Sequence, residues 1–375
     1  MNEMILIFFS KNKNVERDGG EEVFYFEAVK NLLAVKTNVH EFNWSFGSAM
    51  PQINEEEFEL HRIRLEVIVE DFELPEDLGE RESFHYFYHI PESNGMVYVR
   101  DLVFNKKLMW KIVNADTSHP SLVINPAYYK YVKFRFINLH SVYELLTDLA
   151  AYLLLKEGYA PLYGAAFELN GRTTLTFAPP NTGKTLTSMK ACTDFEARYI
   201  SEDLSITDGE HIYAVPWTCS YRPSTFRSSS SASKWKEKCF EIFPILELLK
   251  NKRPSLIHIW NQSNRIVHRS KCSQIFVLEK SPNINMEEKD SKEIYRKVLQ
   301  LNGYRFHYMK SPLLAAFTYF NPSFTLEEAY KNEMNIIKSL VENADRSFVL
   351  QGPDASDYMN SIQGVNDNEK STRIS

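Results

Sequence analysis

Residues Ala178–Thr185 (APPNTGKT) follow an apolar, β-branched run and precede a segment typical of a helix. Gly183 lets a backbone pass close to phosphate oxygens, because a side chain there would intrude. Lys184 can bring a positive charge to the outer phosphates, and Thr185 can offer its hydroxyl to Mg²⁺. The start of the helix adds unpaired N–H groups and about half a positive charge. We therefore predict a phosphate-binding loop between a strand and a helix over Lys184–Asp194.

The loop departs from the usual pattern at its beginning. Ala178 stands where a glycine normally opens the motif, and Pro179 and Pro180 each lack a backbone N–H. The alternative is an ordinary strand–turn–helix with a coincidental lysine. Backbone donors remain at the four following positions, which are Asn181, Thr182, Gly183 and Lys184.

An acidic pair, Glu202 and Asp203, lies eighteen and nineteen residues after Lys184, behind a predicted strand over Ala197–Ile200. Ligands of layered α/β sheets collect at such strand ends. Phosphoryl transfer needs charge neutralisation and an oriented nucleophile. We expect Asp203 to hold Mg²⁺ together with Thr185, and Glu202 to accept the proton of an attacking hydroxyl. A solvent-facing acidic pair is the alternative.

Two hairpins flank these motifs. Asn170-Gly171 between Gly164–Leu169 and Arg172–Phe177 predicts two strands joined by a type I′ turn. Asp208-Gly209 between Leu204–Thr207 and Glu210–Val215 predicts the same arrangement. Further along, we expect a strand over Gln274–Leu278, a helix near Leu326–Val341 and a last strand over Ser347–Leu350.

A helix is predicted to begin at Ser141, which forms a capping box with Glu144. Gly158 suits a left-handed stop. Before this helix the chain is rich in strand-forming residues, and the acidic stretch Glu55–Glu76 leaves a helix, a strand or both open. The helix has one apolar face, formed by Val142, Leu145, Leu146, Leu149, Leu153 and Leu154. The expected early strands are Met4–Phe9, Phe84–Ile90, Met96–Phe104 and Tyr131–Ile137.

Composition narrows the function classes. A chain of 375 residues with 43% apolar and 25% charged residues is typical of a globular protein with room for two domains. A net charge of −6 without a basic block argues against nucleic acid as a partner. No apolar run is long enough for a membrane span, and four cysteines without metal-ligand spacing favour a cytoplasmic location. Whether the protein forms a homo-oligomer is left open by the sequence.

Residues Tyr221–Lys238 are rich in serine and basic residues. This segment could close over the site as a lid, with Arg222 and Arg227 reaching a phosphate, or it could be a solvated loop. We predict three parts of the chain: a β-rich N-terminal domain over 1–138 that recognises a substrate, a phosphate-loop domain over 139–355, and a largely disordered tail over 356–375.

The order of these elements resembles the kinase domain of HPr kinase/phosphorylase and related serine kinases. The resemblance covers roughly residues 140–355 and rests on Tyr163-Gly164, Ala178–Thr185 and Glu202-Asp203. It implies an α/β fold similar to that of PEP carboxykinase: a mixed sheet with a phosphate loop and flanking helices. The resemblance also implies that Lys184 and Thr185 bind ATP and Mg²⁺, that Asp203 is a metal ligand, and that Glu202 is the catalytic base.

The chain departs from the family in three ways. Tyr163 stands where relatives commonly have a histidine that assists the chemistry, and Glu202 stands where the first of two aspartates is usual. The glycine-rich segment of true HPr kinases is missing after the acidic pair. We therefore expect a phosphotransferase that uses ATP to modify a hydroxyl, such as a serine of a peptide or protein other than HPr. The alternatives are a nucleotide-binding regulatory protein without transfer activity, and an ATPase or small-molecule kinase.

Overall fold

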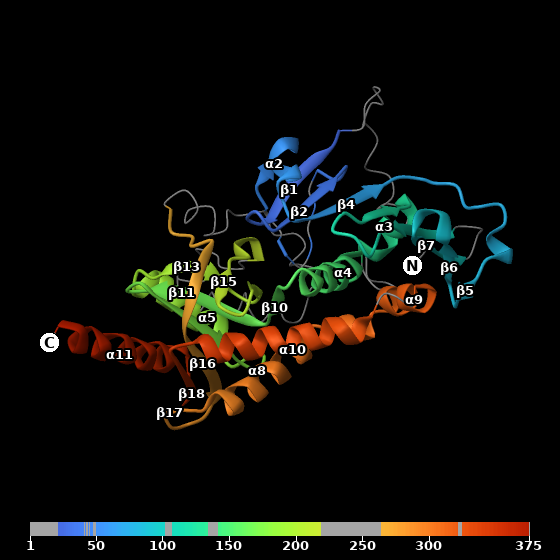
Figure 1. Ribbon diagram of the computed structural model, residues 1–375. Helices are drawn as coiled ribbons and strands as arrows, with labels where there is room; N and C mark the ends of the chain where they lie inside the picture. The colour runs from blue at the N-terminus through green and yellow to red at the C-terminus, as the bar shows by residue number, and fades with distance from the viewer. Residues whose placement is uncertain are drawn as a thin grey trace, which may run out of the picture.

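Two large mixed β-sheets with helices around them make up the described part of the chain (Figure 1). A computed structural model describes residues 22–40, 42, 44, 46, 47, 50–101, 107–133, 142–218, 264–321 and 325–374. Within these residues each sheet has nine strands. The chain is therefore a mixed α/β protein, as the sequence predicts at that level.

The first sheet has the strand order β3-β1-β2-β4-β9-β8-β7-β6-β5. The pairs β2–β4 and β4–β9 are parallel, and the other neighbours are antiparallel. Its strands are β1 (Phe24–Val29), β2 (Leu33–Thr37), β3 (Gln52–Ile53), β4 (Ile63–Val69), β5 (Ser83–Phe84), β6 (Phe87–Ile90), β7 (Gly95–Asp101), β8 (Lys107–Val113) and β9 (Ser121–Ile124).

The second sheet has the order β10-β14-β15-β16-β12-β11-β13, and β18 and β17 continue it from β16. The pairs β12–β16 and β16–β18 are parallel. Its strands are β10 (Ala160–Leu162), β11 (Gly164–Leu169), β12 (Arg172–Phe177), β13 (Arg198–Ser201), β14 (Ser205–Thr207), β15 (His211–Tyr213), β16 (Arg269–Lys280), β17 (Asn285–Glu288) and β18 (Arg346–Gly352).

The helices are α2 (Glu55–Glu59), α3 (Pro126–Lys133), α4 (Val142–Lys156), α5 (Lys184–Asp194), α8 (Ser291–Arg305), α9 (Pro312–Phe320), α10 (Leu326–Asn343) and α11 (Ala355–Ile374). In Figure 1, α8 and α10 run side by side along the second sheet, and α11 extends to the C-terminal end.

Helices cover both faces of the second sheet. Successive side chains of a strand point to opposite faces, so neighbouring residues of β16 show which helices lie on each side. Ile275 and Val277 of β16 belong to a buried cluster with Val298 of α8 and Ile337 of α10. Phe276 and Leu278 belong instead to a larger cluster that contains residues of α5 and α11. The larger cluster also contains side chains of α4 and of the first sheet, so one continuous apolar core joins the two sheets.

Several predicted elements are confirmed at their expected positions. Strands β11 and β12 and helix α5 have the predicted bounds. Asn170 and Gly171 both have positive φ, at 56° and 77°, as a type I′ turn requires. Gly158, two residues after the end of α4, has a φ of +83°, as predicted for a left-handed stop. Local sequence signals therefore suffice for this part of the fold.

The second predicted hairpin has a different turn. Thr207 pairs with Ile212, which leaves a four-residue loop in place of a two-residue turn. Gly209 has a positive φ, but Asp208 is not among the described residues with one. The Asp208 carboxylate instead accepts the backbone N–H groups of Glu210 and His211. This local capping competes with the type I′ geometry that the dipeptide predicted.

Three other predictions are wrong in part. Phe84–Ile90 is not one strand, because His85, at a φ of 58°, lies in the turn between β5 and β6. Tyr131–Lys133 belongs to α3 and not to a strand, so its alternating pattern was misleading. The tail predicted as disordered over 356–375 is the helix α11 through Ile374, because Tyr358, Met359, Ile362 and Val365 are buried against the core.

Some predictions lie outside the described residues. They concern the strand Met4–Phe9, the cap at Ser141, and the segment Tyr221–Lys238 with Arg222 and Arg227. The acidic stretch whose structure was left open contains both elements, α2 and β4. The boundary between 138 and 139 stays a prediction.

We predict that Gly171→Ala lowers the free energy of unfolding by about 1–2 kcal/mol, the cost of the left-handed conformation for a residue with a side chain. A Cβ at Gly171 would meet nothing within 4 Å, so backbone strain is the expected cause. Urea denaturation measures the change. Gly79→Ala is the matched control, since that Cβ is equally unobstructed and its φ is not positive. Equal losses in both variants would contradict the prediction.

Candidate phosphate-binding site

Strand directions bring the predicted site residues to one edge of the second sheet. Both β12 and β13 run antiparallel to β11, so they run in the same direction as each other. The loop after β12, the turn after β13 and the first residue before β11 therefore meet at the same edge. These segments carry Ala178–Gly183, Glu202-Asp203 and Tyr163. The fold therefore brings together the loop and the acidic pair, which are separated in the sequence.

The loop leaves β12 and enters α5 through two left-handed residues. Asn181 has a φ of 62°, and Gly183, at the N-cap of α5, has a φ of 110°. Asparagine and glycine are the residues that adopt this conformation at least cost. Ala178 and Thr182 are buried, whereas Asn181 is exposed. The Thr182 N–H donates to the Pro179 carbonyl at 3.4 Å, so of the four backbone donors expected in the loop this one is already used inside the loop.

Lys184 is the best-defined side chain of the site. Its Nζ lies 2.6 Å from Asp203 Oδ1 and 3.9 Å from the centroid of the Tyr163 ring. The Lys184 side chain is only 5% exposed, whereas that of Asp203 is 50% exposed. The ammonium is thus held inside the protein by a carboxylate that still reaches solvent and by the face of an aromatic ring.

Burial lowers the pKa of the Lys184 ammonium below its ordinary value. The carboxylates of Asp203 and Glu202 oppose this shift, and the charge of Arg305 adds to it. Burial also raises the pKa of the Tyr163 phenol, and Asp203 raises it further. Tyr163 therefore stays protonated at neutral pH, and it cannot serve as a general base in place of a histidine.

Glu202 is 2% exposed and so lies deeper than Asp203. Its negative charge is close enough to Lys184 to raise the pKa of the ammonium. The turn that carries the pair is fixed from both sides. The hydroxyl of Ser205 donates to the Gly164 carbonyl at the start of β11, and it contacts the hydroxyl of Ser201 at the end of β13. The strand pairing also shifts between Ala166 and Phe167, a bulge of the kind found beside functional sites.

Helix α5 packs against β11 and α11. Its buried Thr187 and Ser188 hydroxyls donate within the helix, to the carbonyls of Gly183 and Thr185. A Cβ built on Gly183 would lie 3.7 Å from the Ala355 Cβ, so the beginning of α11 covers the back of the loop. Thr185 is half-buried at the second position of α5.

The residues present are compatible with a nucleotide and a magnesium ion. Among the described residues, no group of three or more His, Cys, Asp and Glu side chains is placed to hold a metal. Mg²⁺ commonly needs only one or two carboxylates, since phosphates and waters complete its shell. The half-exposed carboxylate of Asp203 and the hydroxyl of Thr185 would supply the protein's share. The weak point is the loop's beginning, where two prolines lack N–H donors.

Sequence reasoning missed a polar network behind this site. Asn302 of α8 accepts the Tyr163 N–H at 2.8 Å and donates to the Pro161 carbonyl at 3.0 Å. It also donates to Glu333 of α10 at 2.5 Å. Glu333 had a detectable signal, because it is a charged residue on the apolar stripe formed by Ala329, Ile337 and Leu340. Asn302 had none, since its partners are distant in the sequence.

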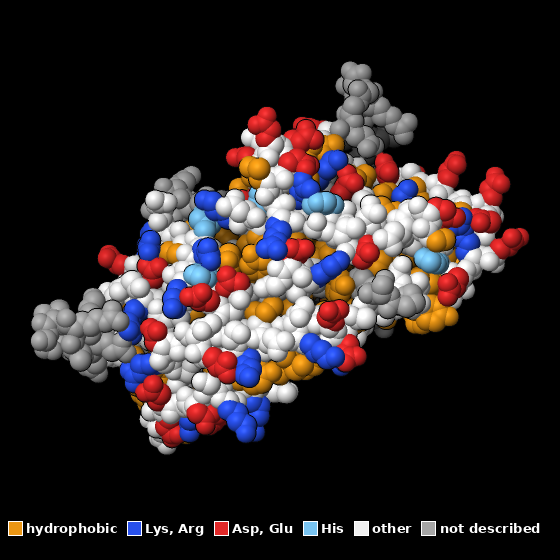
Figure 2. Space-filling view, in the orientation of Figure 1, with side chains coloured by type: hydrophobic (Ala, Val, Ile, Leu, Met, Phe, Trp, Pro, Cys, Tyr) orange, Lys and Arg blue, Asp and Glu red, His pale blue; other side chains and the backbone are white. Residues whose placement is uncertain are grey.

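A comparison with protein-family models and with curated proteins finds no match to this chain. None of the helices in the described ranges is long and apolar enough to cross a membrane. On the face seen in Figure 2, basic and acidic side chains are interspersed. The resemblance to HPr-kinase-like proteins and the roles it implies stay predictions.

We predict that Asp203→Asn lowers the pKa of the Lys184 ammonium further, because the variant removes the nearest negative charge while burial persists. A pH titration of ¹⁵N-labelled lysine side chains by NMR measures the pKa, and Lys184→Arg identifies the signal. Glu327→Gln removes an exposed carboxylate that pairs with Lys331, and it should leave the Lys184 pKa unchanged. An unchanged pKa in Asp203→Asn would rule out the ion pair as the stabilising contact.

Proposed function

We propose that this protein is an ATP-dependent phosphotransferase that acts on a hydroxyl group, in particular a serine of a peptide or protein. The supporting observation is the convergence of the loop lysine, the acidic pair and the helix start at one sheet edge. A finer fold assignment belongs to the same proposal: the second sheet with its flanking helices would be an HPr kinase/PEP carboxykinase-like domain.

The proposed roles of the site residues follow from how exposed each side chain is to solvent. ATP with Mg²⁺ supplies the phosphoryl group and neutralises its charge. Lys184 contacts the outer phosphates, and the start of α5 directs its N–H groups at them. Asp203 is the metal ligand, since half of its side chain is open to solvent. Because Lys184 pairs with Asp203, the lysine would have to release this carboxylate in order to contact a phosphate.

Glu202 is the group that accepts the acceptor's proton. Its position beneath the sheet edge shields it from water, which favours proton transfer from a bound hydroxyl over loss to solvent. Tyr163 has a different part. Its ring keeps the lysine amine in place, and its protonated phenol removes no proton. The base of this site would be a single carboxylate.

One observation favours a second candidate function, a nucleotide-binding protein without transfer activity. Tyr163 occupies the position of an assisting histidine, and its raised pKa prevents it from replacing that histidine as a base. Nucleotide binding needs only the loop, Lys184 and a metal ligand. The two candidates differ in what happens when Glu202 is changed.

Lys184→Met should weaken ATP binding by about tenfold to hundredfold, the range expected for loss of a charged hydrogen bond. Calorimetric titration with Mg²⁺ and ATP measures this change. Lys190→Met is the matched control, because Lys190 lies on the same helix and pairs with Asp194 instead. If both variants bind ATP as tightly as the unaltered protein, the loop is no phosphate site and both candidate functions fall.

Glu202→Gln should leave ATP binding intact and reduce phosphoryl transfer by roughly 10²–10⁴-fold, the usual contribution of a general base. Transfer is measured with γ-labelled ATP, Mg²⁺, and either a serine peptide library or a cell lysate. Labelled product that disappears in this variant supports the kinase. ATP binding without labelled product in the unaltered protein supports the binding protein instead.

A further inference from the structure

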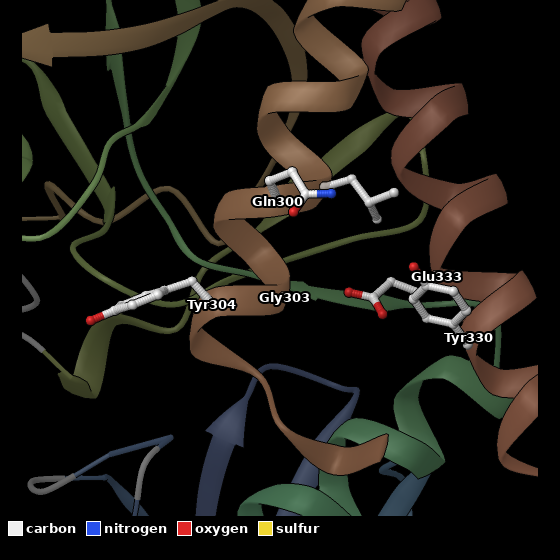
Figure 3. A pocket seen from close by; sticks show the side chains of 6 residues that line it. Gln300, Gly303, Tyr304, Tyr330 and Glu333 are labelled. Atoms are coloured by element: carbon white, nitrogen blue, oxygen red, sulfur yellow. The ribbon is translucent and has the colours of Figure 1, made fainter. Parts of the chain in front are cut away.

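A pocket of about 370 Å³ lies between α8 and α10 (Figure 3). The Glu333 side chain extends from α10 toward Gly303 of α8, and Tyr330 lies beside it. The pocket is lined by Leu299, Gln300, Gly303, Tyr304, Tyr330 and Glu333.

Glu333 is a buried carboxyl group that the phosphotransfer chemistry does not use. It is 4% exposed, and its two oxygens accept from Asn302 at 2.5 Å and from the Tyr308 hydroxyl at 2.6 Å. A carboxylate can accept about four hydrogen bonds, so two positions remain. In the described part of the chain no basic side chain forms an ion pair with Glu333. Burying such a charge without a cation is costly.

Gly303 leaves additional space on the α8 side of the pocket. It lies inside α8, where glycine costs about 1 kcal/mol relative to alanine. A Cβ at this position would meet nothing within 4 Å, and its φ is not positive, so neither crowding nor backbone conformation requires a glycine here. What the absent side chain provides is space in front of the Glu333 carboxylate.

We propose that this pocket binds a cationic side chain, an ammonium or a guanidinium. The free acceptor positions of Glu333 match the N–H donors of such a group, and the ring of Tyr330 beside Glu333 suits a cation. Burial raises the pKa of the Glu333 carboxyl, as expected for a carboxylate without its counter-ion. A bound cation would supply the charge that the pocket lacks.

The location assigns this group to the phosphate acceptor, a step that rests on the proposed function. Asn302 bonds to Glu333 on one side and to the Tyr163 backbone on the other, and the Tyr163 ring contacts the Lys184 amine. The pocket is thus one residue removed from the reacting edge. A lysine or arginine of the acceptor held there would bring a neighbouring serine toward the loop.

Calorimetry with N-acetyl-arginine amide, N-acetyl-lysine amide and the neutral isostere N-acetyl-citrulline amide tests the pocket. At least one cationic probe should bind at least tenfold more tightly than citrulline. Glu333→Gln should lose at least tenfold of that affinity, and Gly303→Leu should lose it by filling the space. Glu327→Gln, which removes an exposed carboxylate elsewhere on α10, is the matched control and should bind normally.

Equal binding of the charged and neutral probes, retained binding in Glu333→Gln, or no binding of any probe would each overturn the proposal. Circular dichroism and urea denaturation check that the variants fold. ATP titration of the same variants separates the two proposals. Probe binding without ATP binding leaves the cation pocket standing and removes the kinase, whereas ATP binding without probe binding does the reverse.

Discussion

A single buried ammonium group organises the candidate site of this protein. Lys184 lies at the start of α5, almost fully removed from water, and a charge there requires a partner. Asp203 supplies the opposite charge and Tyr163 supplies a ring face. These residues come from three segments of the second sheet, so the ammonium can be accommodated only when the loop after β12, the turn after β13 and the start of β11 are all in place.

Much of this edge could be predicted from local sequence. The Asn170-Gly171 turn and the β-branched run before the loop have short-range causes, and their bounds were right. Asp208-Gly209 carried the same turn signal, but the aspartate's own hydrogen bonds to the following N–H groups favoured a longer loop. A local signal fails when a second local interaction competes with it.

The polar network behind the site shows a different limit. Asn302 contacts Tyr163 and Glu333, and no periodic pattern connects residues so far apart. Glu333 could have been suspected because it interrupts an apolar stripe. Its role could not, since a misplaced charge in a sequence does not reveal whether it faces a cavity, a partner or solvent. The same holds for α11, whose polar residues suggested disorder while its apolar minority was enough to dock the helix.

The buried face of α8 serves both the core and the candidate site. Val298 packs in the core under the sheet, and Asn302, one turn further along the same face, bonds to the Tyr163 backbone and to Glu333. A change in the packing of α8 against α10 would be felt both at Glu333 and at the Tyr163 backbone. Through Asn302, the helix connects the surroundings of Glu333 to the segment that carries Tyr163.

The parallel pairing of β12, β16 and β18 has a consequence for how the protein reaches its native state. Strand β12 is paired with β16, and β16 with β18, so segments near residues 175, 275 and 350 must find one another across long intervening stretches. Such distant contacts form late and slowly. The loop that follows β12 is anchored to a strand held by these long-range pairs, so its position depends on an assembly that the neighbouring sequence cannot complete alone.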